Sequence, residues 1–295
     1  MFALIGVEAR AGLVHDPSIT PELAYLNFAA QFPSVGWLFG QNNGVDAAFG
    51  SGVLIHPNFV LTAAHLALEV DNNPATTYDS YDFGVGSNFS NNPGESHISY
   101  KAFVHPDYIS FGNGPDLALL YFEVPFTSVN PPAFYGGAVA VGDQVSIAGY
   151  GEYGTPSIGL QGYDGNRRAG SNYIDAIDSP NGYFDTRLRR PINMDFNPLG
   201  ILVTPGDSGG GWFVEVGGEF QLAGITSFWG GTPLYNGTSS ATYLTHEIGG
   251  WIKETQSAAV PEPSAFLFFT ILISVVGVYK GTARWLPGQR SKIVG

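Results

Sequence analysis

Gly206-Asp207-Ser208-Gly209-Gly210 is the stretch of this 295-residue sequence that decides both its fold and its chemistry. Glycines surround the serine, and glycine accepts the tight, strained backbone on which an exposed nucleophile is presented. A serine hydroxyl is a weak nucleophile, so it needs a base to take its proton and donors to stabilise an oxyanion. Ser208 is therefore a candidate nucleophile whose partners must come from other segments.

Two upstream segments supply residues of the required chemistry. Leu61-Thr62-Ala63-Ala64-His65 ends an apolar run in a histidine that can act as a general base. Asp116 opens the apolar run Asp116-Leu117-Ala118-Leu119-Leu120, where a carboxylate at the edge of a buried strand can orient the imidazole. Alone, each residue more often has a structural role, as a buried histidine, a capping acid or a loop serine. The three become a catalytic triad only if their order and flanking residues agree.

Their order and flanks resemble the trypsin/chymotrypsin family of serine proteases. The resemblance covers residues 32–255 and includes the order His, Asp, Ser with separations of 51 and 92 residues. Further segments that match the family are Thr62-Ala63-Ala64-His65, His105-Pro106-Asp107-Tyr108, Ala148-Gly149-Tyr150-Gly151 and Gly224-Ile225-Thr226-Ser227. The resemblance implies a triad of His65, Asp116 and Ser208, and a serine endopeptidase.

The fold expected from the resemblance is all-β. It implies two antiparallel six-stranded β-barrels with the active site between them, followed by a C-terminal helix. The composition agrees, because 40 Gly, 20 Pro, 21 Phe, 15 Tyr and 5 Trp favour short strands joined by tight turns. Ile248, Trp251 and Ile252 stand at helical spacing and predict an amphipathic helix near residues 245–255.

Several further site residues are implied by the same resemblance. The backbone N–H groups of Gly206 and Ser208 would form the oxyanion hole, and Asp207 would pair with a freed N-terminal amine. Gly12-Leu13-Val14-His15-Asp16 is the nearest candidate for that terminus, although it lacks the family's two glycines. The residues expected to bind substrate are Leu202, Ser227, Phe228 and Trp229.

Leu202 stands six residues before Ser208, where enzymes that cleave after basic residues carry an acid. A leucine would not compensate the charge of a buried cation. The sequence therefore predicts an apolar or small side chain before the scissile bond.

Composition excludes some other classes of function. The sequence has no cysteine, so it forms no disulfide, thiolate metal site or cysteine nucleophile. A formal net charge of −13 argues against a nucleic-acid partner. The histidines show no His-x-x-x-His spacing, and the expected chemistry needs no cofactor, so neither a metal nor a cofactor is predicted.

The N-terminal segment, residues 1–31, precedes the expected protease domain. Its apolar start, residues 1–7, is shorter than the core of a signal peptide, whereas Ala9-Arg10-Ala11 resembles a cleavage site. We therefore expect a truncated signal or propeptide here.

The C-terminal segment resembles a PEP-CTERM sorting signal of Gram-negative bacteria. A linker, residues 256–264, contains Pro261-Glu262-Pro263, and a basic tail occupies residues 287–295. Between them, residues 265–286 are expected to cross a membrane once, with flanking Lys and Arg on the cytoplasmic side. The resemblance implies an exported protein, anchored in the inner membrane as a precursor. A sorting enzyme would then cleave near the motif and release it to the periplasm, cell surface or medium.

Two other functions remain open for the same fold. One is a surface binding module that has lost turnover, and the other is an esterase that uses the same triad. The Gly-x-Ser-x-Gly elbow of α/β-hydrolases is missing at Ser208, which disfavours an esterase of that fold.

Overall fold

The computed structural model describes residues 12–69, 76–110, 112–179, 181–232 and 234–259. The chain divides into two compact units, residues 1–255 and residues 256–295. The expected Pro-Glu-Pro motif, membrane segment and basic tail lie outside the described residues. Among the helices that the described ranges contain, none combines the length and the apolar character needed to cross a lipid bilayer.

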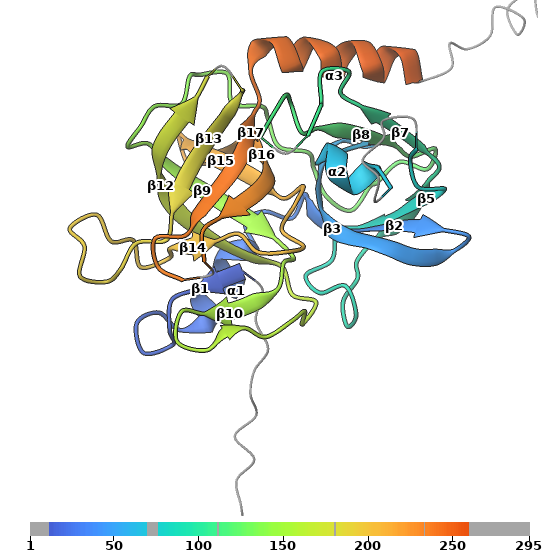
Figure 1. Cartoon of the computed structure of the whole chain (residues 1–295). Helices are drawn as coiled ribbons and strands as arrows, with labels where there is room; N and C mark the ends of the chain where they lie inside the picture. The colour runs from blue at the N-terminus through green and yellow to red at the C-terminus, as the bar shows by residue number, and fades with distance from the viewer. Residues whose placement is uncertain (1–11, 70–75, 111, 180, 233, 260–295) are drawn as a thin grey trace, which may run out of the picture. The chain divides into compact units, whose positions relative to one another are not determined.

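One sheet of the first unit is a closed six-stranded antiparallel barrel, with strand order β12-β13-β17-β16-β15-β9 (Figure 1). The strands are β9 (Gln144–Gly149), β12 (Arg168–Asp178), β13 (Tyr183–Arg187), β15 (Gly211–Val216), β16 (Glu219–Gly230) and β17 (Thr238–Tyr243). Phe184 and Trp212 meet edge to face in its core, with ring centroids 5.1 Å apart. This barrel confirms half of the predicted architecture.

The other large sheet has seven strands in the order β6-β5-β2-β3-β4-β8-β7. They are β2 (Val35–Asn42), β3 (Val45–His56), β4 (Phe59–Thr62), β5 (Ser80–Gly84), β6 (Ser96–Ser99), β7 (Lys101–Val104) and β8 (Ala118–Tyr121). The β2–β3 hairpin turns at Asn43 and Gly44, which both have positive φ, as this tight turn requires.

The prediction of a second closed six-stranded barrel is wrong for this sheet. Its two edge strands, β6 and β7, are consecutive in the chain and only Tyr100 separates them. One bent strand thus pairs with β5 before the bend and with β8 after it. Ser99, which is buried, donates from Oγ to Tyr121 O at 2.7 Å and accepts from Lys101 N at 3.2 Å. The seven strands therefore do not form a closed ladder, and the two edge strands are joined by a bend that the Ser99 hydroxyl bridges.

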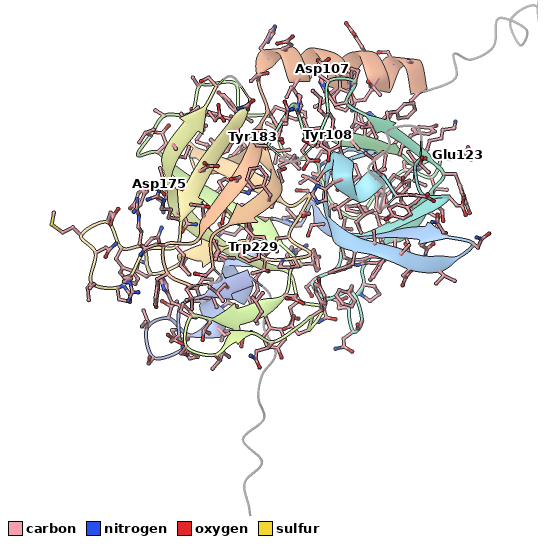
Figure 2. The ribbon with its side chains drawn as sticks, viewed as in Figure 1. Asp107, Tyr108, Glu123, Asp175, Tyr183 and Trp229 are labelled. Carbon is pink, nitrogen blue, oxygen red and sulfur yellow. The ribbon has the colours of Figure 1, made fainter. Side chains whose placement is uncertain are left out.

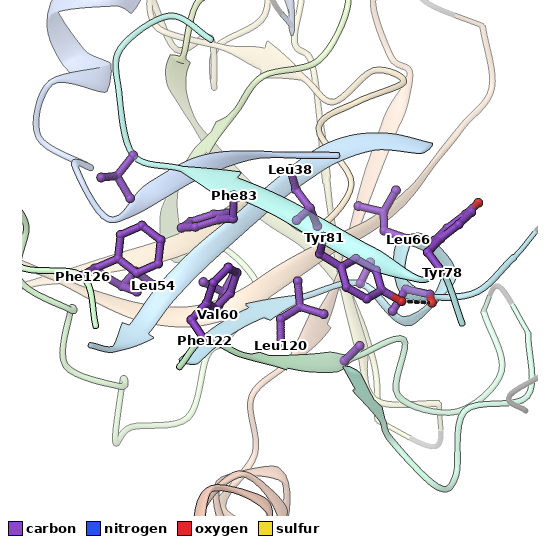
Figure 3. Packing of buried hydrophobic residues seen from close by; sticks show 14 residues of the cluster. Leu38, Leu54, Val60, Leu66, Tyr78, Tyr81, Phe83, Leu120, Phe122 and Phe126 are labelled. Carbon is purple, nitrogen blue, oxygen red and sulfur yellow. Dashed lines mark hydrogen bonds between the residues drawn. The ribbon is translucent and has the colours of Figure 1, made fainter. Parts of the chain in front are cut away.

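Aromatic and aliphatic side chains fill the interior of this seven-stranded sheet (Figure 3). Phe83, Phe122 and Phe126 pack on one another with centroids 5.4–6.1 Å apart. Tyr81 is buried with them, and its hydroxyl donates to Ala67 O at 2.6 Å. This core fixes β4 and β8, the two strands next to the predicted site residues.

Residues 12–31, which precede the expected protease domain, are part of the folded unit. Strand β1 (Gly12–Val14) joins a small sheet with strand order β11-β10-β1-β14. The other strands of this sheet are β10 (Tyr153–Thr155), β11 (Gly159–Leu160) and β14 (Ile201–Leu202). Helix α1 (Glu22–Ala29) packs against β12. The described fold therefore begins before the boundary expected at residue 32.

Two other helices complete the described fold. Helix α2 (Ala64–Ala67) is a single turn after β4, and α3 (His246–Ala259) follows β17. Ile248 and Ile252 of α3 are buried, and the ring of Trp251 lies 4.7 Å from that of His105. The predicted C-terminal helix is confirmed.

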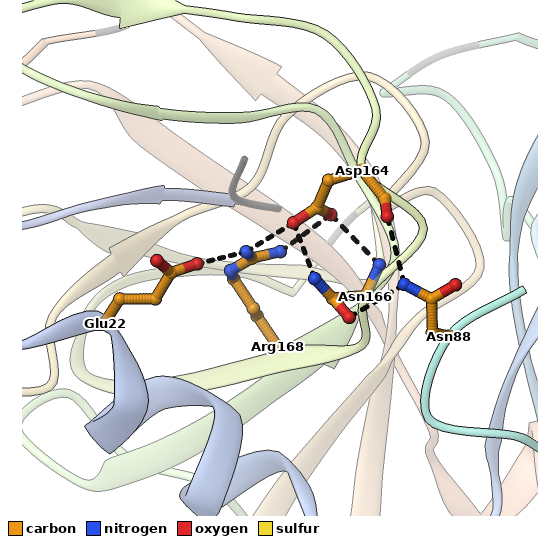
Figure 4. A network of polar contacts seen from close by, with 5 residues as sticks. All are labelled: Glu22, Asn88, Asp164, Asn166 and Arg168. Atoms are coloured by element: carbon orange, nitrogen blue, oxygen red, sulfur yellow. Dashed lines mark hydrogen bonds and ion pairs between the residues drawn. The ribbon is translucent and has the colours of Figure 1, made fainter. Parts of the chain in front are cut away.

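A buried charged network attaches α1 to β12 (Figure 4). The Arg168 guanidinium donates twice to the Asp164 carboxylate, at 3.0 and 2.6 Å, and also to Glu22 of α1. The side chains of Arg168, Asp164 and Glu22 are 1%, 4% and 7% exposed. Asn166 donates to Asp164 at 2.7 Å, and Asn88 donates to Asn166 at 2.8 Å. Buried charges persist only where partners compensate them.

We predict that Arg168→Leu lowers the free energy of unfolding by about 3–5 kcal/mol, because two buried carboxylates lose their cation. Urea unfolding of the purified chain measures the change. Arg190→Leu is the matched control, since Arg190 is exposed and its guanidinium lies over the ring of Tyr235, 5.4 Å from the ring centroid. The control should cost about 1 kcal/mol or less. Equal losses in the two variants would contradict the structural role assigned to the network.

Candidate active site

His65 and Asp116 lie at the ends of neighbouring strands and bond directly. Asp116 stands just before β8, and His65 lies in α2 just after β4, which pairs with β8. The Asp116 carboxylate accepts from the His65 backbone N–H at 3.0 Å and from His65 Nδ1 at 2.8 Å. A carboxylate only accepts hydrogen bonds, so Nδ1 carries the ring proton and Nε2 keeps its lone pair.

The Asp116 carboxylate is fully buried and has a third donor. Ser227 Oγ of β16 donates to the same oxygen that His65 Nδ1 contacts. Ser227 was predicted to bind substrate, but its hydroxyl contacts Asp116 here. Because His65 and Asp116 belong to the seven-stranded sheet and Ser227 to the barrel, this carboxylate joins the two.

Tyr108 and Tyr183, which are labelled in Figure 2, lie close enough to Asp116 for its charge to act on them. Tyr183 of β13 donates from its hydroxyl to Gly114 O at 2.7 Å, two residues before Asp116. Burial, aided by the charge of Asp116, raises the pKa of Tyr183 to about 12 and also raises the pKa of Tyr108. Both phenols therefore stay neutral near physiological pH and add no negative charge beside the carboxylate.

Ser208 lies in the loop between β14 and β15, which we call the serine loop (residues 204–210). Ser208 and His65 line the same cleft, of about 430 Å³, together with Val203, Thr204, Pro205 and residues 226–229. Among the described residues, no hydrogen bond joins the Ser208 and His65 side chains. Such bonds are often long before substrate binds.

Backbone hydrogen bonds hold the serine loop and leave two of its N–H groups available to bind an oxyanion. Pro205 O accepts from Glu152 N, Asp207 N donates to Thr204 O, and Asp207 O accepts from Gly210 N. Within the described part of the chain, neither Gly206 N nor Ser208 N donates to any acceptor. These are the two N–H groups predicted for the oxyanion hole. Gly206 has φ +92°, so a side chain there would be strained.

Sequence analysis missed Ser51 of β3, which contacts the serine loop from the opposite sheet. Ser51 N donates to Ser208 O at 2.8 Å, and Ser51 Oγ donates to Gly206 O at 2.9 Å. Ser51 is fully buried. The signal was the pattern Gly50-Ser51-Gly52. A Cβ added to Gly50 would lie 3.1 Å from Ser208 O, so the sheet approaches the loop too closely for larger residues.

Asp207 has internal partners in this structure. Its two oxygens accept from Gly151 N at 2.7 Å, Thr204 N at 2.9 Å and Thr204 Oγ1 at 3.0 Å. Leu13 and Val14, proposed as a new terminus, are buried in β1 and pair with β14. The pairing of Asp207 with a freed amine stays a prediction, and Thr204 is a second residue that sequence analysis missed.

The predicted substrate-binding residues divide into two groups. Phe228, Trp229 and Ser227 line the cleft. Leu202 does not, because it points the other way from β14 and packs with Leu13 and Leu188. Successive residues of a strand face opposite sides, so Val203 lines the cleft in place of Leu202. Among the residues that the structure describes, the cleft lining contains no Asp, Glu, Lys or Arg.

Among the described residues, no group of three or more His, Asp or Glu side chains is arranged to hold a metal ion.

A buried Asp–His pair that shares a cleft with a loop serine is the arrangement of serine hydrolases, and here it lies between a closed barrel and an open seven-stranded sheet. Comparison with known proteins narrows the class. The family model described as Trypsin matches residues 28–252, so the chain belongs to the trypsin family. The chain is also 27% identical over 255 residues to urokinase-type plasminogen activator of Gallus gallus. The match covers 79% of this chain and 57% of that protein, so the chain spans little more than half of its relative.

We predict a pH-dependent contribution of Asp207 to stability. Burial raises the pKa of Asp207 to about 6 from its usual 3.8, although hydrogen bonds from Gly151 and Thr204 oppose the rise. A pKa that is higher in the folded state adds stability at low pH, and this stability is lost as the pH rises through the folded-state value. Relative to Asp207→Asn, the unfolding free energy of the wild type should therefore fall between about pH 4 and pH 7.

Urea unfolding of both proteins across this pH range tests the prediction. Burial lowers the pKa of His15, so His15 adds stability as the pH rises, opposite in sign to Asp207. Because His15 is present in both proteins, its contribution cancels in the comparison. If the wild type instead gained stability over Asp207→Asn with rising pH, the hydrogen bonds would outweigh burial at this carboxyl.

Proposed function

We propose that this chain is a serine endopeptidase that hydrolyses peptide bonds through an acyl-enzyme on Ser208. The observation that carries the proposal is the two-point bond between Asp116 and His65. It fixes the proton on Nδ1 and leaves Nε2 to act as a base within the cleft that holds Ser208. Membership of the trypsin family supports the same conclusion.

In the proposed mechanism, Ser208 Oγ attacks the scissile carbonyl carbon while His65 Nε2 takes the hydroxyl proton. The imidazolium that forms is stabilised by the Asp116 carboxylate 2.8 Å from Nδ1. The N–H groups of Gly206 and Ser208 stabilise the oxyanion, and each such donor contributes roughly 3 kcal/mol to transition-state stabilisation. His65 then protonates the leaving amine. In the second half-reaction it deprotonates a water molecule, which attacks the acyl carbon and frees Ser208.

The substrate proposed for this site has an apolar or small side chain before the scissile bond. The cleft wall of Val203, Thr226, Phe228 and Trp229 supports this choice, because it offers no carboxylate to a cation. Val203 and half-buried Trp229 both line the cleft and pack with the barrel core, so they present apolar surface to a substrate. The leucine at position 202 adds nothing to this selection, because it lies outside the cleft.

The two alternative functions are less well supported. An esterase would need only the same acyl chemistry, so ester hydrolysis is expected as a side activity of the proposed peptidase. A binding module without turnover would have no need of two available N–H groups beside a serine and an imidazole with a fixed tautomer.

We also propose that the enzyme is exported. The Pro-Glu-Pro motif with its following apolar and basic segments supports an inner-membrane precursor that a sorting enzyme cleaves. The fold uses no disulfide, since the sequence contains no cysteine, so export does not depend on oxidative folding. Its partners would then be protein or peptide substrates and the sorting enzyme, and no nucleic acid.

We predict that Ser208→Ala abolishes cleavage of labelled casein and labelling by a fluorophosphonate probe, because both reactions require the Ser208 hydroxyl. Gel fluorescence and casein hydrolysis measure the two effects. Ser90→Ala, at an exposed loop serine, is the control and should behave as the wild type. Undiminished labelling of Ser208→Ala, or a wild type without either activity, would contradict the proposed function.

We predict that p-nitroanilide peptides with Phe, Leu or Val before the scissile bond have kcat/KM values at least about tenfold above those with Lys or Arg. The physical reason is that the cleft provides no counter-charge for a cation. Initial rates over a matched peptide series measure the ratio. A preference for Lys or Arg would overturn the assignment of Val203 and Trp229 to the substrate pocket.

A further inference from the structure

Ser51 is a buried serine at the point where the seven-stranded sheet meets the serine loop. Its backbone and side chain make four hydrogen bonds outside the strand ladder, two as donor and two as acceptor. Its N–H donates to Ser208 O at 2.8 Å, and its carbonyl accepts from Thr62 Oγ1 at 2.7 Å. Its Oγ donates to Gly206 O at 2.9 Å and accepts from Tyr150 N at 3.0 Å.

The hydrogen bond that Ser51 Oγ accepts determines where its own proton can point. A hydroxyl has one proton, and the Tyr150 N–H already points at the oxygen. The hydroxyl proton is therefore directed to Gly206 O. Since Tyr150 follows barrel strand β9, this one atom connects a strand of the sheet, a strand of the barrel and the serine loop.

The Gly206–Asp207 peptide is where such a bond matters most. Gly206 has φ +92°, and a glycine with this freedom lets its neighbouring peptide groups rotate at little cost. On the carbonyl side, Ser51 Oγ holds Gly206 O, and on the amide side, Asp207 N donates to Thr204 O. Together they fix the orientation of the peptide that separates the two available N–H groups.

The backbone bond from Ser51 N to Ser208 O does not need a serine, because any residue except proline could make it. The bond from Oγ to Gly206 O does need a hydroxyl. The close approach of the chains leaves little room for substitutes, since a Cβ added to Gly209 would lie 2.0 Å from Ser51 O. The side chain of Ser51 thus has a task distinct from its place in the strand.

We propose that Ser51 is a positioning residue for catalysis, whose hydroxyl holds the Gly206–Asp207 peptide so that Gly206 N–H stays directed at the developing oxyanion. This inference rests on the proposed function of Ser208. Ser51 itself touches neither substrate nor the reacting atoms. Its contribution should therefore appear in transition-state stabilisation and leave substrate binding nearly unchanged.

The test uses the full chain and p-nitrophenyl acetate, a small ester that makes few specificity contacts. Stopped-flow measurement gives the acylation rate constant and the half-saturating ester concentration separately. For Ser51→Ala we expect the rate constant to fall roughly 10- to 100-fold, part of the 10²–10³ that loss of a whole oxyanion donor costs. The half-saturating concentration should stay within about twofold of the wild-type value.

A second measurement reports on the oxyanion hole directly. Phenylboronic acid forms a tetrahedral adduct with an active serine, so its affinity should fall with the acylation rate in Ser51→Ala. Acylation of Ser51→Ala at the wild-type rate would overturn the proposal. A slower acylation without any loss of boronate affinity would also overturn it.

Ser171→Ala is the matched control for a buried serine. Ser171 of β12 is 4% exposed, its Oγ accepts from the side chains of Gln144 and Asn197, and no hydrogen bond within the described residues joins it to the serine loop. This variant should lose thermal stability and keep the acylation rate. If Ser171→Ala slowed acylation as much as Ser51→Ala, the effect would be one of general stability and the proposal would fail.

Ser51→Cys keeps the proposal testable if Ser51→Ala does not fold. Cysteine keeps the shape of the serine side chain, with a slightly larger terminal atom, but a thiol forms only weak hydrogen bonds, so acylation should again slow. Wild-type acylation by Ser51→Cys would show that a side chain of this shape is enough, and would overturn the proposal. Failure of the proposed function is distinguishable from these outcomes, because then the wild-type chain would not acylate at all.

Discussion

The structure depends on the compensation of one fully buried carboxylate, that of Asp116. Three donors satisfy it, two from His65 and one from Ser227, and they come from both large sheets. An uncompensated carboxylate at this depth would cost several kcal/mol. The same contacts that remove this cost fix the imidazole and bring the sheets together. Folding and the proposed chemistry therefore share a single electrostatic requirement.

Residues with short-range signals could be predicted from the sequence. Gly206 and Gly209 predicted a tight loop around Ser208, and both adopt positive φ in the structure. The spacing of Ile248 and Ile252 predicted helix α3, because residues four positions apart lie on the same face of an α-helix. The all-β class and one closed barrel were likewise predictable from the motifs.

Features that depend on pairing between distant strands could not be predicted. Leu202 was placed in the pocket by counting back from Ser208, but its orientation depends on the pairing of β14 with β1, almost 190 residues earlier. Strand β1 is too short to show an alternating pattern of its own. The glycines on either side of Ser51 indicate a close approach but not which segment approaches, and Thr204 is a small polar residue without a motif. The roles of both residues follow only from the sheet and loop that meet there. The roles of His65, Asp116 and Ser208 stay predictions until the variants are measured.

The bend at Tyr100 ties the two edges of the seven-stranded sheet to a single stretch of chain. In an open sheet, each edge strand can slip by two residues on its neighbour without affecting the other edge. Here a slip of β6 along β5 would drag β7 along β8, because one residue offers no slack between them. The register of the β5–β6 pair is thereby coupled to the register of the β7–β8 pair. The register of β8, the strand that follows Asp116, therefore depends on how β6 pairs with β5 at the other edge of the sheet.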